Sequence, residues 1–128
     1  MSEQPEQPEQ PAHPSDLTDL ASEWLDWSQV GERLSVTPAK VRTMIRDHEL
    51  ASAVPSPGAG PRVPADFLDG DLVVKGLPGL LTVLHDHGYD DRECIEWLFT
   101  DLDLPGRPID ALRENRGAEV KRRAQAMG

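Results

Sequence analysis

The chain has 128 residues, of which 38% are hydrophobic, 28% charged and 5% aromatic, and its formal net charge is −10. This length suits one domain, or two very small ones that share a core filled mainly by aliphatic side chains. The single cysteine excludes an intrachain disulfide, and no apolar run approaches the ~20 residues needed to cross a bilayer. The N-terminus lacks the basic and apolar regions of a signal peptide. We therefore expect a cytoplasmic protein with no membrane partner.

Residues 1–22 are expected to be a disordered acidic tail. The repeat EQPEQPEQP has no apolar periodicity, so it buries too little apolar surface to offset the entropy of ordering. One interpretation is a solubilising leader. The alternative is a regulatory tail that competes with DNA for a basic surface or accepts a phosphate, for which the hydroxyls are those of Ser2, Ser15, Thr18 and Ser22.

Residues 23–70 have the pattern of two helices joined by a tight turn and followed by two short extended segments. We expect structure to begin near Trp24, with Ser28 as the N-cap of a first helix in which Val30 and Leu34 share one face. This segment carries the least acidic balance of the chain. Residues 28–68 have five basic and four acidic residues, whereas residues 1–27 have seven acidic and no basic ones.

After a turn at Ser35 and Val36, Thr37-Pro38 predicts the start of the second helix, because a hydroxyl cap is followed by proline at the first helical position. This helix should end around Asp47–Glu49. Its core positions, spaced three and four apart, are Val41, Met44 and Ile45. The sides left open carry Lys40, Arg42, Thr43 and Arg46.

Residues 51–54 are expected to form a strand that ends at the Pro/Gly-rich run 55–61, which has too few backbone donors to continue it. Residues 62–64 would return as a second strand, so the run between them is the tip of a wing with Arg62 at its base. Phe67 and Leu68 are expected to close the small core.

Residues 71–128 are expected to be helical, after a linker at residues 69–71. Leucines at i, i+3, i+4 and i+7 predict one buried helix face, at Leu77, Leu80, Leu81 and Leu84. Asp90 or Asp91 caps a next helix that buries Cys94, Ile95, Leu98 and Phe99. A loop over 100–108 precedes helices at 109–113 and 118–127. The leucine face is core or, alternatively, a homodimer contact. The Lys121-Arg122-Arg123 cluster is a solvated helix end or an auxiliary phosphate contact.

The sequence favours no enzyme, cofactor or metal site. In His85-Asp86-His87 the two histidines are two apart on a helix and point in different directions, and no further ligand cluster accompanies them. Cys94 lies on an apolar face, which indicates a buried, inert thiol. The glycine-rich runs lack the lysine and hydroxyl residue of a phosphate loop.

These patterns predict a mainly α protein with a small β wing, in which a winged helix-turn-helix precedes a helical C-terminal subdomain. The function expected is binding of double-stranded DNA, as a transcriptional or architectural regulator, through the major groove and the flanking phosphates. The expected contacts are Ser35, Thr37, Lys40, Arg42, Thr43, Arg46 and Arg62. The alternative is a protein-interaction module that keeps this shape without binding DNA, in which case the cations are only a solvated helix face.

Two resemblances support this interpretation. The runs Thr37–Arg42 (TPAKVR) and Val63–Leu68 (VPADFL) resemble the winged helix-turn-helix of excisionase and MerR-like proteins. The runs Val74–Thr82 (VKGLPGLLT) and 122–127 (RRAQAM) resemble an actinobacterial family of small winged-helix DNA-binding proteins known in mycobacteria as a substrate of a Ser/Thr protein kinase. This resemblance implies DNA binding through the winged helix and phosphorylation of the N-terminal tail, within which Thr18 is the candidate on account of its hydroxyl and its acidic surroundings. A DNA-binding protein of this kind is expected in the cytoplasm or on the nucleoid. The stretch WLFTDLDLPGRPIDAL is also similar to the C-terminal domain of certain Xre-type antitoxins, which keeps an antitoxin or adaptor role open.

Overall fold

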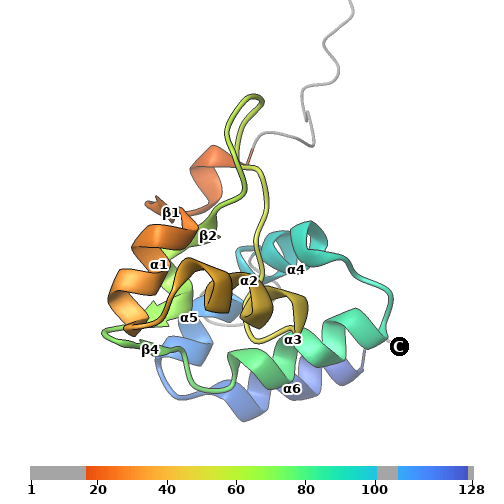
Figure 1. Ribbon diagram of the computed structural model, residues 1–128. Helices are drawn as coiled ribbons and strands as arrows, with labels where there is room; N and C mark the ends of the chain where they lie inside the picture. The colour runs from red at the N-terminus through yellow and green to blue at the C-terminus, as the bar shows by residue number, and fades with distance from the viewer. Residues whose placement is uncertain (1–16, 101–106, 127–128) are drawn as a thin grey trace, which may run out of the picture.

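The computed structural model describes residues 17–100 and 107–126, which form a mainly helical fold with small antiparallel sheets (Figure 1). This general architecture agrees with the expectation from the sequence. The elements, with η marking a 3-10 helix, are η1 (Thr18–Leu20), β1 (Trp24–Leu25), α1 (Trp27–Leu34), α2 (Pro38–Arg46), β2 (Val63–Pro64), η2 (Ala65–Phe67), β3 (Leu68–Asp69), β4 (Leu72–Val73), α3 (Leu77–Asp86), α4 (Asp91–Leu98), α5 (Pro108–Arg113) and α6 (Gly117–Gln125).

The first helix begins two residues before the expected start. The Asp26 side chain accepts a hydrogen bond from the Gln29 N–H at 2.8 Å, and the Gln29 side chain accepts one from the Asp26 N–H at 2.8 Å. The prediction of Ser28 as N-cap was therefore wrong, because this reciprocal capping box satisfies the free donors two residues earlier. The cap of α2 is confirmed, since Thr37 Oγ1 accepts from the Lys40 N–H at 3.1 Å and Pro38 is the first helical residue.

The turn between α1 and α2 is tight. Ser35 adopts a left-handed conformation with φ 61°, and the Val36 N–H donates to the Gly31 carbonyl at 2.9 Å. A Cβ atom at Gly31 would lie 2.6 Å from the Val36 oxygen, so only glycine allows this approach of helix and turn. The turn thereby sets the position of α2 against α1.

The expected strand over 51–54 is reduced to a single antiparallel bridge between Ala53 and Arg62. Beyond it, β2 pairs with β1 rather than with this segment, with Trp24 opposite Pro64 and Leu25 opposite Val63. The prolines that follow Ala53 have no backbone N–H to donate, and the glycines make the backbone flexible, so a longer ladder of hydrogen bonds does not form there. The Pro/Gly-rich loop (residues 54–61) projects from the fold at the top of Figure 1.

Residues 17–22, which the sequence analysis assigned to the tail, are part of the fold. Leu17 is buried, and its N–H donates to the Pro55 carbonyl at 2.6 Å. The Thr18 hydroxyl donates to the same carbonyl at 3.3 Å, and the Trp24 indole N–H donates to the Thr18 carbonyl at 3.1 Å. The boundary of the tail was therefore placed too late, because Leu17 and Ala21 supply the apolar surface that the repeat lacks. The remainder of the expected tail, residues 1–16, lies outside the described residues.

Residues 69–71 are not a linker. They belong to a hairpin in which Leu68 pairs with Val73 and Asp69 with Leu72, and Gly70 has the positive φ of 63° that the turn requires. Phe67 and Leu68 are buried as predicted.

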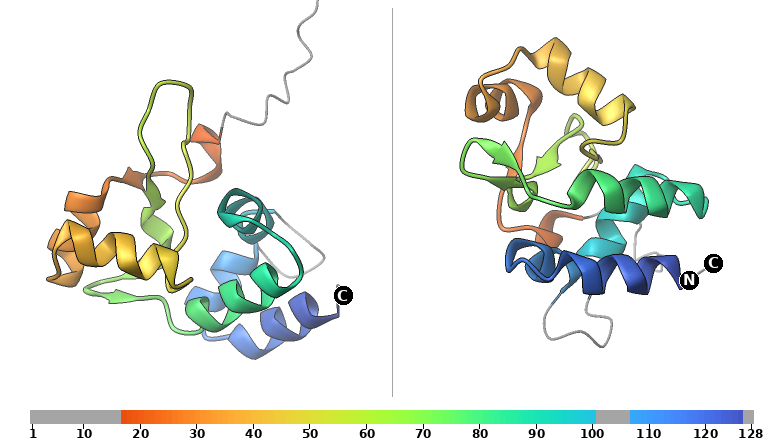
Figure 2. Two further views of the ribbon diagram at one scale, coloured as in Figure 1. Left: turned by 45° about the vertical axis from the view of Figure 1, so that its right-hand side comes forward. Right: turned by 90° about the horizontal axis from the view of Figure 1, so that it is seen from below.

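The C-terminal helices pack on the rest of the chain through one continuous core. The leucine face of α3 is fully buried, and Asp90 caps α4 with Glu93 in a second capping box. The predicted apolar face of α4 is likewise buried, and the core cluster takes residues from all six α-helices. Helices α3 and α6 lie side by side (Figure 2). None of the helices in the described part of the chain combines the length and apolarity needed to span a membrane.

Two arginines connect the C-terminal half to the N-terminal half. The Arg113 guanidinium donates to the carbonyls of Asp66 at 2.8 Å and Leu68 at 2.7 Å. The Arg107 guanidinium donates to the Leu20 carbonyl at 3.3 Å. The two expected subdomains thus share both core and hydrogen bonds, so motions of one relative to the other are restricted.

Candidate nucleic-acid interface

Helix α2 exposes cationic side chains to solvent while one of its sides packs in the core. Val41 and Met44 are buried on one side, while Lys40, Arg42 and Arg46 are exposed. Arg42 and Arg46 are four residues apart, so both project from the same side of the helix, and Lys40 lies on the opposite flank. The side chains that the sequence analysis selected on this helix are therefore outside the core, but they do not form one compact cluster.

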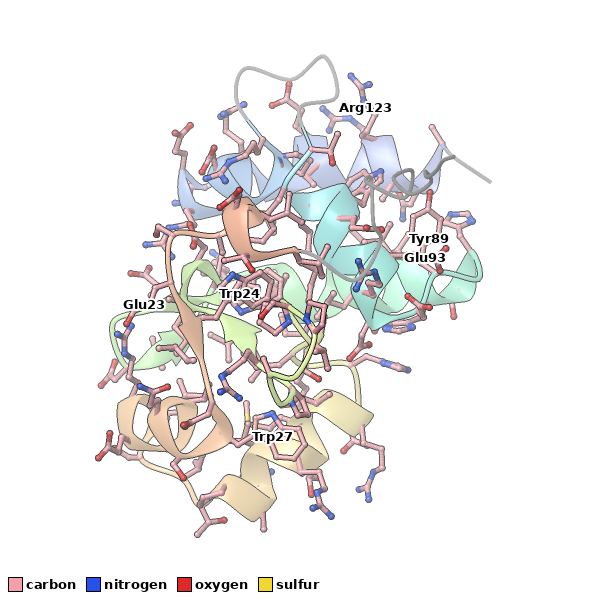
Figure 3. All side chains as sticks on the ribbon, turned by 90° about the horizontal axis from the view of Figure 1, so that it is seen from above. Glu23, Trp24, Trp27, Tyr89, Glu93 and Arg123 are labelled. Atoms are coloured by element: carbon pink, nitrogen blue, oxygen red, sulfur yellow. The ribbon has the colours of Figure 1, made fainter. Side chains whose placement is uncertain are left out.

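Arg42 is oriented by an aromatic ring. Its guanidinium carbon lies 5.7 Å from the centre of the Trp27 ring, which belongs to the first turn of α1 (Figure 3). Such a cation–π contact holds the plane of the guanidinium while the edge donors stay available for another acceptor. Arg42 makes no ion pair with a carboxylate in the residues that the structure describes.

Arg46 is partly neutralised by its neighbour in sequence. Its Nε atom lies 3.4 Å from Asp47 Oδ1, and its side chain is 73% exposed. Exposed ion pairs of this kind are weak and screened by salt, so a phosphate would compete readily for the guanidinium. The Asp47 carboxylate remains nearby and repels a polyanion, which reduces the attraction that Arg46 can contribute.

The hydroxyl groups of Ser35, Thr37 and Thr43 differ in the hydrogen bonds that they already make within the protein. The Thr37 oxygen already accepts the Lys40 N–H, and Pro38 has no N–H, so the helix N-terminus has few backbone donors left. Ser35 is exposed in the turn. The Thr43 hydroxyl donates to the Ala39 carbonyl at 3.2 Å, which directs it along the helix.

Arg62 lies at the base of the Pro/Gly-rich loop, where it forms the bridge with Ala53. Its side chain is half-buried, and its guanidinium donates to the Pro61 carbonyl at 3.3 Å. The loop itself carries no charged side chain. Arg62 is therefore the single cation that this part of the chain brings to a ligand.

The basic cluster of α6 does not extend the α2 surface. Helices α2 and α6 lie on opposite sides of the molecule, as Figures 2 and 3 show from below and from above. Lys121 lines a hollow together with Lys75, at the neighbouring N-terminal ends of α3 and α6. A straight duplex that touches α2 would not reach these cations.

Two further features with reactive side chains are the Cys94 thiol and a cluster of two histidines and one aspartate. Burial, with the carboxylates of Asp91, Asp90 and Glu93, raises the pKa of the Cys94 thiol to about 12, so this thiol is not a nucleophile at neutral pH. His85 lies beside His48 and Asp91, a grouping that sequence reasoning missed because His48 is far along the chain from the other two and reaches them only through the packing of the end of α2 on α3 and α4. The neighbours considered from the sequence, Asp86 and His87, are not in this group.

The comparisons with known proteins agree with one another. Residues 74–128 match the family model described as the Rv2175c C-terminal domain of unknown function. The chain is 41% identical over 115 residues to the DNA-binding protein Rv2175c of Mycobacterium tuberculosis (strain ATCC 25618 / H37Rv), covering 80% of this chain and 78% of that protein. The NMR structure of Rv2175c is similar to this fold with a TM-score of 0.76 and 39% sequence identity, covering 88% of this chain and 85% of that one.

Proposed function

This chain belongs to the family of the mycobacterial DNA-binding protein Rv2175c, and on that premise we propose that it binds duplex DNA as a transcriptional or architectural regulator. In this proposal α1, α2 and the Pro/Gly-rich loop act as a winged helix-turn-helix. The observation that carries it is the surface of α2, where Arg42 and Arg46 project to solvent from a helix whose other side is in the core.

Recognition would place α2 in the major groove. Arg42, already oriented by Trp27, would donate to a guanine edge or to a phosphate. Arg46 would exchange its ion pair with Asp47 for one with a phosphate of the DNA backbone. Lys40, on the opposite flank of α2, would bind a phosphate of the other DNA strand. Thr43 would face the groove between Lys40 and the two arginines. Ser35 and Thr37 would donate to a phosphate beside the start of the helix.

The wing would contribute one contact. Arg62 at its base would reach the adjacent backbone or the minor groove, while the uncharged tip adds no electrostatic attraction. Few cations and a net charge of −10 make the expected affinity modest and strongly dependent on salt.

The proposal is tested by fluorescence anisotropy of the full chain with labelled duplex at two salt concentrations. Arg42→Ala and Arg46→Ala should each weaken binding by at least about fivefold and make the salt dependence shallower by roughly one phosphate contact. Lys75→Ala removes the same charge from the hollow beside α6 and serves as the matched control, with affinity expected to stay within about twofold. Absence of binding at low salt, or equal losses in all three variants, would contradict the assignment of α2.

The runner-up function is that of a protein-interaction module, antitoxin-like or adaptor. It is favoured by the uncharged loop and by the acidic body of the chain. A wild-type protein that binds no duplex, but is captured through α2 by an acidic protein partner, would support it. Selection from a random duplex library separates the two functions further, and enrichment of a palindromic site would indicate a homodimer.

We further propose that a Ser/Thr protein kinase controls the interaction through Thr18. The Thr18 hydroxyl donates to the Pro55 carbonyl of the Pro/Gly-rich loop, whereas the phosphate dianion that predominates at neutral pH has no O–H to donate and adds negative charge beside the proposed wing. Thr18→Asp should therefore weaken DNA binding relative to Thr18→Ala. Deletion of residues 1–16 should tighten binding if the acidic tail competes with DNA, and unchanged affinity would exclude this role for the tail.

A further inference from the structure

Three side chains with metal-ligating atoms meet where the end of α2 contacts α3 and α4. His48 follows α2, His85 lies in the last turn of α3, and Asp91 is the first residue of α4. The two imidazole rings stack with centroids 3.8 Å apart, and His85 Nε2 lies 2.9 Å from Asp91 Oδ1. One ligand atom from each residue lies within 4.8 Å of the other two.

The two imidazoles are poorly satisfied by the protein itself. His48 Nδ1 and His85 Nε2 are both shielded from solvent and have no hydrogen-bond partner in the part of the chain that the structure describes. The short contact of His85 with Asp91 is not aligned as a hydrogen bond. Buried polar nitrogens normally have a partner, so an additional group at this position would remove an unfavourable feature of the fold.

We propose that His48, His85 and Asp91 form a binding site for one divalent transition-metal ion, with Zn²⁺ as the best fit. Two imidazole nitrogens and a carboxylate oxygen suit Zn²⁺, whereas Mg²⁺ and Ca²⁺ prefer oxygen ligands alone. Zinc binds such atoms at about 2.0–2.2 Å, so the two stacked imidazole rings have to turn until one nitrogen of each points at the ion together with the Asp91 carboxylate. Three protein ligands leave a fourth position for water.

The backbone around the three ligands is already ordered. The second oxygen of Asp91, Oδ2, accepts the Ser52 N–H at 3.1 Å, which fixes the plane of the carboxylate as outer contacts of metal ligands commonly do. His48 adopts a left-handed conformation with φ 64°, and its N–H donates to the Ile45 carbonyl at 3.1 Å. A residue other than glycine in this conformation is costly, so its position is imposed by the surrounding packing.

A bound ion would connect the end of α2 to the C-terminal helices. His48 belongs to the half of the chain that carries the proposed DNA-binding helix, while His85 and Asp91 belong to the C-terminal half. Because His48 is far along the chain from His85 and Asp91, the three ligands come together mainly in the folded state, which the ion therefore binds and stabilises. The site stands on these contacts alone and does not depend on whether α2 binds DNA.

The test uses the full chain stripped with a chelator, followed by calorimetric titration with ZnCl₂ and optical titration with CoCl₂. We expect one ion per chain, a visible absorption band for Co²⁺ and a higher melting temperature with Zn²⁺. His85→Gln and His48→Asn should each weaken Zn²⁺ binding at least tenfold and abolish the thermal shift. Asparagine is used at position 48 because it tolerates the left-handed conformation.

The matched control is His87→Gln, which removes a histidine from the same helix end but outside the site, and it should bind Zn²⁺ as the wild type does. Circular dichroism verifies that each variant is folded, and if His85→Gln is unfolded, His48→Asn decides. No stoichiometric binding by the wild type would overturn the proposal. It would also be overturned if His87→Gln lost as much affinity as the folded ligand variant, since binding would then be nonspecific.

Discussion

Gly31→Ala should destabilise the protein although alanine is the better helix former. An added Cβ atom at this position would lie 2.6 Å from the Val36 backbone oxygen. A backbone atom in a tight turn cannot rotate away as the end of a side chain does, so α1 and the turn must separate. The position of α2, and with it the proposed DNA-binding surface, thus depends on the absence of a side chain at Gly31.

The magnitude follows from two opposing effects. Replacing glycine by alanine inside a helix contributes about 1 kcal/mol of stability. Overpacking a well-packed site costs about 1–3 kcal/mol, and a contact this short with backbone belongs at the upper end or beyond. The expected net loss is therefore about 2 kcal/mol, which corresponds to a fall in melting temperature of about 6–12 °C for a chain whose size lies between the small and the large single domains.

Thermal and urea unfolding followed by circular dichroism measure this loss. The matched control is Gly79→Ala in the first turn of α3, where the nearest atom to the new Cβ is the Lys121 Nζ at 4.0 Å, so no contact is too short. This control should be as stable as the wild type or slightly more stable. If Gly31→Ala were also as stable as the wild type, the close approach of helix and turn would not be a constraint, and the reasoning would be refuted.

Three further predictions concern charge and reactivity. Asp47→Asn frees Arg46 and removes a repelling carboxylate, so DNA affinity should rise by about threefold at low salt, and an unchanged or lower affinity would contradict the role of Arg46. The hydrogen bond from Arg107 lowers the pKa of Asp110 below its ordinary value of 3.8, so the ionised carboxylate stabilises the folded state above that pH and this contribution disappears as the pH falls further. The advantage of the wild type over Asp110→Asn in urea unfolding should therefore shrink below about pH 4, and a constant difference would exclude the linkage. The pKa of about 12 predicts that the Cys94 thiol reacts with a disulfide reagent at pH 8 only after denaturation, and rapid reaction of the folded chain would show that it is accessible.

Features determined by neighbours in the chain could be predicted from the sequence. The Thr37 cap and the cap at Asp90 depend on a side chain and an N–H three residues later, and the buried face of α3 depends on leucine spacing. The exposure of Lys40, Arg42 and Arg46 followed from the same periodicity. The misplaced cap at Ser28 was a local error, since Asp26 offers a competing and better satisfied start.

The sequence by itself thus determined which segments are helical, where most of them begin and which faces they bury, because those choices rest on contacts within one or two turns. Only the tertiary structure decided that β1 pairs with β2 across nearly forty residues, that residues 17–22 pack on the Pro/Gly-rich loop, and that His48 meets His85 and Asp91. Such pairings depend on the closure of long loops and on the competition among many apolar surfaces for one core, and no local spacing records the outcome.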